Sequence, residues 1–289
     1  MCGRAGLVVL VIAFLGALAA VATVRSWTTA VAAGDYTTVE TARARIEVDD
    51  PTCDPRWEKE LAACMARVPA FSSLDPLRLE QASRALLALP FVAEVGEPRV
   101  RWPDGFEVPV RLRKPVACIR VREVYLNVDA DGFVLPGEHP APLWRSNGFL
   151  PVLGPNDGTL DRIAPGERLV DEHRRDALAV ALSMRKHLTA RDFETLGPPL
   201  IDARNGRRAS VEEPGVVIRL PDSRAIFFGR PPNTGEPGEL PAQLKWSAVS
   251  RASERLSTSE EQRDWSVLDV RWDVPAIQWR AAVVPLAED

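Results

Sequence analysis

The chain has 289 residues, of which 46% are hydrophobic, so it can bury the core of one large domain or of two ordinary ones. Its 36 basic and 40 acidic residues give a net charge of -4, which excludes a strong general attraction to nucleic acid. The 25 prolines are spread along the chain and predict many turns and few long helices.

No chemical motif stands out. The four cysteines form no C-x-x-C pair and the three histidines stand far apart in the sequence, whereas zinc sites use closely spaced ligands. The sequence also lacks a P-loop, a dinucleotide fingerprint, a G-x-S-x-G elbow and an H-E-x-x-H motif. We therefore expect no catalytic site, no metal site and no cofactor.

The N-terminal segment predicts a single transmembrane helix. Residues 7–24 carry no charge and lie between Arg4 and Arg25, and as a helix they would span about 27 Å, near the hydrocarbon thickness of a membrane. We expect residues 1–28 to be a short cytoplasmic tail and this helix, placing the bulk of the chain outside the cytoplasmic (inner) membrane. The predicted anchor residues are Leu7, Val11, Phe14, Leu18 and Val24.

A cleaved signal peptide is the alternative interpretation of this segment. Residues 20–22 and 30–32 both read Ala-Val-Ala, the small-x-small form that signal peptidase accepts. A signal peptide usually has an apolar run of only about 7–15 residues, so the length favours a retained anchor.

Residues 40–117 predict a β-α-α-β-β unit. Residues 42–48 alternate small or apolar residues with charged ones, as an edge strand would. Pro55 then opens a helix that ends at Pro69. Asp75 and Pro76 provide the N-cap and first position of a second helix. A β-hairpin follows, with strands at 99–102 and 106–112 around the turn Pro103-Asp104-Gly105.

Cys53 and Cys64 are candidate disulfide partners, because an extracytoplasmic location is oxidising. The alternative is that Cys64 is a core thiol. It shares a helical face with Trp57, Leu61 and Met65.

Residues 118–289 predict a mixed, β-rich region with two helices. The expected elements are a hairpin over 119–135, a helix over 171–188, a hairpin over 216–229, a helix over 241–256 and a last strand within 265–282. Asp129 and Asp131 also suggest a calcium loop. An EF-hand would need glycine at the position of Val134 and an acid at that of Pro140, so a turn is favoured.

Several passages resemble the FtsQ/DivIB family of bacterial cell-division proteins. They are residues 89–92 (LPFV), 100–103 (VRWP), 114–117 (KPVA), 150–155 (LPVLGP) and 269–272 (DVRW). The chain departs from the family pattern at Arg113, where an acidic residue is usual, and at Pro275 and Ala276, which replace a glycine-centred turn.

The resemblance implies an α+β fold with an N-terminal transmembrane helix, a POTRA domain at 40–117 and a β domain at 118–289. It implies a bitopic, non-enzymatic scaffold that links early and late division proteins during septum assembly. In the family an FtsB/FtsL coiled-coil pair adds a strand at the C-terminal strand, and further membrane partners are expected at the POTRA domain. The candidate partner-binding residues are Leu268, Val270, Trp272, Ile277 and Trp279.

Three other interpretations remain at this point, and one of them is an unrecognised hydrolase. A POTRA-containing accessory factor of outer-membrane assembly or secretion, released by signal peptidase, would share the same domain order. Tryptophan most often packs inside a protein, so any one of Trp265, Trp272 and Trp279 could belong to the core rather than to an interface.

Overall fold

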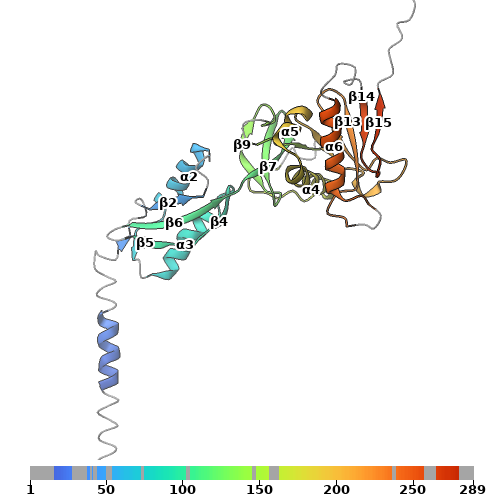
Figure 1. Cartoon of the computed structure of the whole chain (residues 1–289). Coiled ribbons are helices and arrows are strands. Elements are labelled where there is room, and N and C mark those ends of the chain that lie inside the picture. The colour runs from blue at the N-terminus through green and yellow to red at the C-terminus, as the bar shows by residue number, and fades with distance from the viewer. Residues whose placement is uncertain are drawn as a thin grey trace, which may run out of the picture. The chain divides into compact units, whose positions relative to one another are not determined.

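The computed structural model describes residues 16–27, 38–39, 41, 44–49, 54–72, 75–101, 105–144, 148–155, 163–235, 239–256 and 265–279. These residues form an α+β protein that divides into two compact units (Figure 1). Unit 1 runs from Met1 to Leu112 and unit 2 from Arg113 to Asp289.

The structure contradicts the expected transmembrane helix. The helix that the structure describes at this end of the chain covers residues 16–27. Across the described ranges, no helix has both the length and the apolarity needed to cross a membrane, which overturns the predicted single-pass anchor and inner-membrane location. Leu18 and Val24 lie exposed on this helix, whereas Leu7, Val11 and Phe14 lie outside the described residues.

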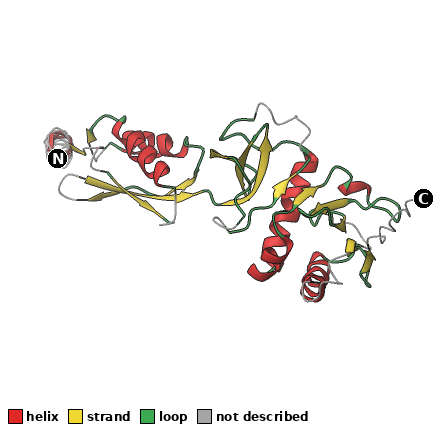
Figure 2. Ribbon diagram, turned by 90° about the horizontal axis from the view of Figure 1, so that it is seen from above, coloured by secondary structure: helices red, strands yellow, loops and turns green. Residues whose placement is uncertain are grey.

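Unit 1 is a small sheet covered by two helices. Strand β6 (Gly105–Leu112) lies in the middle, pairing in parallel with β2 (Arg45–Val48) and antiparallel with both β4 (Val92–Val95) and β5 (Arg99–Arg101). A short pair, β1 (Thr38–Val39) with β3 (Phe71–Ser72), completes the strands described there. The helices α2 (Pro55–Ala66) and α3 (Pro76–Leu87) lie on one face of the sheet (Figure 2).

Both helices of unit 1 begin where the sequence predicts. Asp54 and Asp75 cap them by accepting hydrogen bonds from backbone N–H groups of the first turn, and each cap is followed by a proline. The helices bury Leu61, Met65, Ala82 and Leu86 against the sheet. Phe91 lies at the centre of this core and stacks on Trp57, with ring centroids 5.0 Å apart.

Unit 2 is built on one mixed sheet of nine strands. Its spatial order is β15-β14-β13-β12-β11-β10-β7-β8-β9. The strands are β7 (Pro115–Val121), β8 (Val124–Asp129), β9 (Val134–His139), β10 (Val152–Leu153), β11 (Leu200–Asp202), β12 (Val216–Arg219), β13 (Ala225–Gly229), β14 (Trp265–Asp269) and β15 (Ala276–Trp279). The helices are α4 (Glu172–His187), α5 (Ala190–Leu196) and α6 (Ala242–Leu256), and Gly206–Arg208 form one 3-10 turn.

Two segments contain one more turn than the sequence predicted. A tight turn at Arg122, whose φ is 53°, divides the first expected strand into β7 and β8. The last expected strand likewise divides into β14 and β15, which pair antiparallel. Helix α5 was not predicted, although Thr189 and Asp192 form a capping box at its start.

Arg113, where the chain departs from the family pattern, has a defined role in unit 2. Its Nη1 donates to Asp129 Oδ2 at 2.6 Å, and its guanidinium lies 4.0 Å from the centre of the Phe133 ring. Asp129 Oδ1 also accepts from the backbone N–H groups of Asp131 and Phe133. The Asp129 carboxylate thus stabilises a turn, in agreement with the turn interpretation of this segment.

Asp176 is a buried carboxylate that joins α4 to two loops of unit 2. It accepts from Arg207 Nε at 2.9 Å and from Asn233 Nδ2 at 3.0 Å. Burial alone would raise the pKa of Asp176, but these hydrogen bonds and the Arg207 charge lower it below the ordinary value of 3.8. In acid the unfolded chain therefore takes up a proton at this position before the folded chain does.

The free energy of unfolding of unit 2 should consequently fall as the pH drops below about 3.8 and through the lower folded pKa. The Asp176→Asn variant should be less stable at neutral pH and should lose less stability in acid than the parent. Urea unfolding between pH 6 and pH 2.5 measures both slopes, with Asp131→Asn as an exposed control. Equal acid slopes for parent and Asp176→Asn would contradict this assignment.

A second prediction concerns the core of unit 1. Phe91→Ala removes a fully buried ring that stacks on Trp57 and should cost about 3–5 kcal/mol. Leu77→Ala on α3 removes a side chain that is 68% exposed and should change stability by less than about 0.5 kcal/mol. Hydrogen exchange in increasing urea, measured on peptides from residues 54–112, reports unit 1 separately. Equal losses of stability in Phe91→Ala and Leu77→Ala would contradict this prediction.

Candidate partner-binding edge

Strand β15 ends the nine-stranded sheet. It pairs with β14 through Trp265 with Trp279, Leu268 with Ile277 and Asp269 with Ala276. Among the described residues, no strand pairs with its other edge. All four side chains of β15 are exposed. Backbone N–H and C=O groups on an unpaired edge are available to a strand from another chain.

Strand β14, by contrast, is an interior strand of the sheet. It runs parallel to β13 on its inner side, and it buries Trp265 and Leu268 in the core. Val270, directly after it, is fully buried as well, and its N–H donates to Phe227 O at 3.1 Å. The backbone of β14 is therefore paired on both sides.

The structure divides the five predicted partner-binding residues into two groups. The side chains of Leu268 and Val270 belong to the core of unit 2 and do not reach the surface. The side chains of Trp272, Ile277 and Trp279 are 47%, 37% and 53% exposed. Sequence reasoning treated this region as one strand, so it could not separate the inner strand from the outer one.

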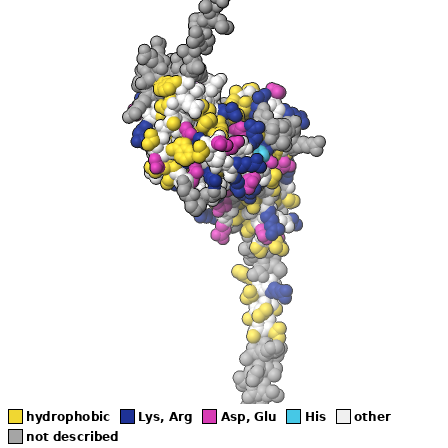
Figure 3. Space-filling view, turned by 90° about the vertical axis from the view of Figure 1, so that its right-hand side faces the viewer, with side chains coloured by type: hydrophobic (Ala, Val, Ile, Leu, Met, Phe, Trp, Pro, Cys, Tyr) yellow, Lys and Arg dark blue, Asp and Glu magenta, His cyan; other side chains and the backbone are white. Residues whose placement is uncertain are grey.

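The apolar face of the sheet continues onto β15 and becomes exposed there. Residues directly opposite each other in an antiparallel pair lie on the same face. Trp279 therefore lies beside buried Trp265, and Ile277 beside buried Leu268. We call Ile277 and Trp279 the apolar ledge. Figure 3 views this side of the molecule, where exposed hydrophobic side chains lie among charged ones.

The opposite end of the sheet is a less open edge. At the start of β9, Val134 N–H donates to Glu167 O at 2.9 Å and Val134 O accepts from Gly166 N–H at 2.8 Å, so this part of the edge is already bonded. Pro136, further along, has no N–H to donate, and Gly137 has a φ of 116° that departs from extended backbone. These features discourage further strand pairing at β9.

Two buried ion pairs lie at the end of β13 and β14, close to the hairpin that carries β15. Asp269 pairs with Arg271 at 2.7 Å, and Lys245 of α6 pairs closely with Glu239. Burial lowers the pKa of Lys245, while the hydrogen bond and charge of Glu239 act to raise it. Lys245 Nζ also donates to Phe228 O at 2.7 Å.

The other predicted site is the disulfide pair of Cys53 and Cys64. Cys53 lies outside the described residues. Cys64 is a free thiol that donates to Ala85 O at 3.4 Å, and burial raises its pKa. Within the described ranges, no group of three or more histidine, cysteine, aspartate or glutamate side chains is placed to hold a metal ion.

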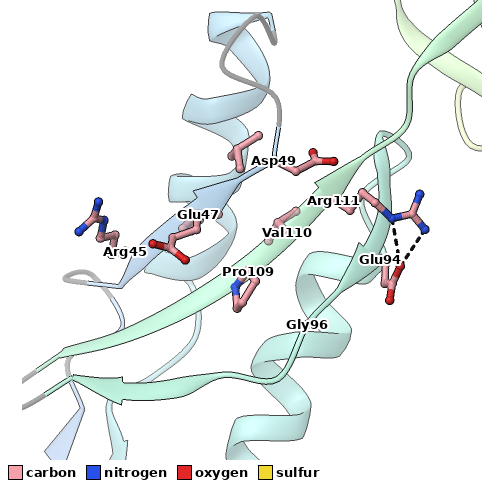
Figure 4. A pocket seen from close by; sticks show the side chains of 10 residues that line it. Arg45, Glu47, Asp49, Glu94, Gly96, Pro109, Val110 and Arg111 are labelled. Atoms are coloured by element: carbon pink, nitrogen blue, oxygen red, sulfur yellow. Dashed lines mark hydrogen bonds and ion pairs between the residues drawn. The ribbon is translucent and has the colours of Figure 1, made fainter.

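Unit 1 has a second open surface, a groove of about 710 Å³ on the face of its sheet (Figure 4). Pro109 and Gly96 lie in its floor, and Arg111 donates to Glu94 at one side through hydrogen bonds of 2.7 and 3.0 Å. A hydrogen bond with Glu107 raises the pKa of Glu47 on the other side. An arginine–glutamate ion pair thus lies on one side of this groove and a pair of glutamates on the other.

The register of β14 and β15 gives a direct prediction. Trp265→Ala removes a ring that is 2% exposed and should destabilise unit 2 by about 3–5 kcal/mol. Trp279→Ala, directly opposite, removes a ring that is 53% exposed and should cost less than about 1 kcal/mol. Urea unfolding compares the two. A large loss from Trp279→Ala would mean that the ledge is part of the core.

Comparison with known proteins gives no identification. No family model matches the chain, and no curated protein matches it significantly.

Proposed function

We propose that this chain is a non-enzymatic scaffold of the bacterial division complex, similar to proteins of the FtsQ/DivIB family. It binds a partner by β-augmentation at β15, which adds a strand to the nine-stranded sheet. In this role it links early and late division proteins during septum assembly. The observation that carries the proposal is that β15 ends the sheet with exposed side chains and with its outer edge unpaired among the described residues.

The two ends of the sheet differ in a way that supports β15 as the binding edge. The β9 end has Pro136, Gly137 and bonds to residues 166–167, which limit the addition of a strand. Residues 276–279 of β15 contain neither proline nor glycine, so each can donate and accept backbone hydrogen bonds. Of the two end strands of this sheet, β15 therefore offers an added strand the uninterrupted backbone edge within the described residues.

The apolar ledge suggests the chemistry of the partner strand. A strand paired with β15 would place every second side chain on the same face as Ile277 and Trp279. Apolar side chains at those positions would cover the ledge and bury its exposed surface. A coiled-coil pair like FtsB/FtsL, with an amphipathic strand after its helices, fits this requirement.

Three of the passages that resemble the FtsQ/DivIB family lie on strands of the structure or directly beside them, and their placement supports the proposal. LPFV (89–92) leads into β4, KPVA (114–117) opens β7, and DVRW (269–272) spans the end of β14 and the turn that follows. In unit 1, α2 and α3 follow β2 and precede β4, β5 and β6, with the short β3 between the two helices, and this order resembles that of a POTRA domain. In the proposed function unit 1 binds further division proteins.

The proposal is tested by crosslinking in cells. A photoreactive residue placed at 277 or 279 should label a small coiled-coil protein, identified by mass spectrometry, because both positions flank the edge where its strand would be added. Position 170 is the matched control, since Val170 is 78% exposed in unit 2 but does not belong to β15. Absence of a coiled-coil adduct from both edge positions, or equal labelling from position 170, would refute the proposal.

A further inference from the structure

The Arg271 guanidinium is one of the contacts that connect the hairpin carrying β15 to the rest of unit 2. Arg271 follows β14 by two residues, and its side chain is only 11% exposed. Its Nε and Nη2 donate to the two carboxylate oxygens of Asp269, at 2.9 and 2.7 Å. The backbone N–H of Arg271 donates to the same carboxylate at 3.1 Å, so the chain is fixed where the strand ends.

The remaining donor of Arg271 reaches a loop far away in the sequence. Nη1 donates to Ser210 O at 2.6 Å and to Glu213 O at 3.1 Å. Ser210 and Glu213 also bond to each other, through Ser210 N–H to Glu213 O at 2.9 Å and Glu213 N–H to Ser210 Oγ at 3.1 Å. Both carbonyl groups thus belong to a preformed turn and converge on the guanidinium.

A close contact at Gly229 connects this cluster with the lysine pair of α6. A Cβ built on Gly229 would lie 2.7 Å from Glu239 Oε1, 3.2 Å from Arg271 Cγ and 3.3 Å from Lys245 Nζ. Gly229 also has a φ of 85°, which favours glycine. Helix α6, the end of β13 and the β14–β15 hairpin therefore meet around a position that has no room for a side chain.

We propose that Arg271 is a positioning residue, which fixes the β14–β15 hairpin to the turn at 210–213 and so holds the β15 edge ready for an added strand. The inference rests on the proposed function of that edge. The geometry supports positioning rather than direct partner contact, because Nε, Nη1 and Nη2 all donate to groups of this chain. A free hairpin would have to be ordered at the moment of binding, which weakens affinity.

The chain provides a matched control for this role. Asp202 and Arg204 repeat the Asp-x-Arg arrangement at the end of β11, with the guanidinium on the carboxylate at 2.7 and 3.0 Å and the Arg204 N–H on Asp202 Oδ1 at 3.2 Å. The Arg204 side chain is 56% exposed, however, so its ion pair is screened by solvent.

Hydrogen exchange of the free protein tests the positioning role without any partner. Arg271→Gln should speed exchange of residues 270–279 by about tenfold, because a charged, multidentate anchor is lost. Exchange in β7 and β8 should change by less than about twofold. Arg204→Gln should leave residues 270–279 unchanged. Equal effects of the two variants, or faster exchange spread over all of unit 2, would overturn the proposal and indicate general stabilisation.

Two further measurements complete the test. Arg271→Lys keeps the charge but cannot reach the carboxylate and both carbonyl groups together, so it should loosen residues 270–279 to an intermediate extent. Arg271→Lys also replaces Arg271→Gln in the exchange test if the glutamine variant does not fold. The yield of the coiled-coil adduct from position 277 should fall at least about threefold in Arg271→Gln. An unchanged yield beside faster exchange would overturn the positioning role alone, whereas no adduct from the parent protein would refute the proposed function.

Discussion

A β-strand has hydrogen-bonding groups on both edges, and a sheet that does not close into a barrel must end in strands with one edge unpaired. Unit 2 places nine strands in one such sheet, with β9 and β15 at its ends. The two ends differ in how far the backbone N–H and C=O groups of the outer edge are already bonded or interrupted. Bonds to residues 166–167 cover part of β9, and a proline and a positive-φ glycine interrupt the rest. At β15, the four residues keep extended backbone and carry exposed side chains.

The position of the sheet's core explains why the β15 edge is apolar as well as open. Helix α6 buries Trp246 and Val249, and Trp246 packs on Phe228 of β13 with ring centroids 4.7 Å apart. The inner strands β13 and β14 are buried, as Ile226, Phe228, Trp265 and Leu268 show. The pairing of β15 carries the same face one strand further, where Ile277 and Trp279 are no longer covered. An apolar surface beside an unpaired backbone edge is a combination that strand addition can satisfy in one step.

The parts of the fold that local chemistry determines were predictable from the sequence. Asp54-Pro55 and Asp75-Pro76 fix the starts of α2 and α3, because a capping carboxylate and a preset φ act within one turn of helix. The hairpin of β12 and β13 follows from two apolar runs around Pro221-Asp222-Ser223. The division of the last strand was missed because Trp265, Leu268 and Ile277 are equally apolar in sequence, and only the pairing partners decide which of them is covered. The predicted membrane helix rested on an uncharged run alone, and among the described residues no helix is long and apolar enough to cross a membrane.

The recurring Asp-x-Arg arrangement shows how burial decides the role of a local motif. In four places among the described residues, an aspartate accepts the N–H of the arginine two residues later and pairs with the same arginine's guanidinium: Asp54 with Arg56, Asp202 with Arg204, Asp222 with Arg224 and Asp269 with Arg271. The sequence pattern is the same in each, and each marks a helix start, a strand end or a turn. At Arg56 and Arg204 the guanidinium is mostly solvated, which leaves the pair little energy to contribute beyond the turn itself.

At Arg271 the side chain is only 11% exposed, and the third donating nitrogen bonds to the turn at 210–213. A buried guanidinium is costly unless its donors are satisfied, so the hairpin can leave this position only by losing several charged hydrogen bonds together. In our proposal, a motif that elsewhere only fixes a local turn or end becomes at Arg271, through its bonds to the turn at 210–213, a connection that positions the last strand of the sheet.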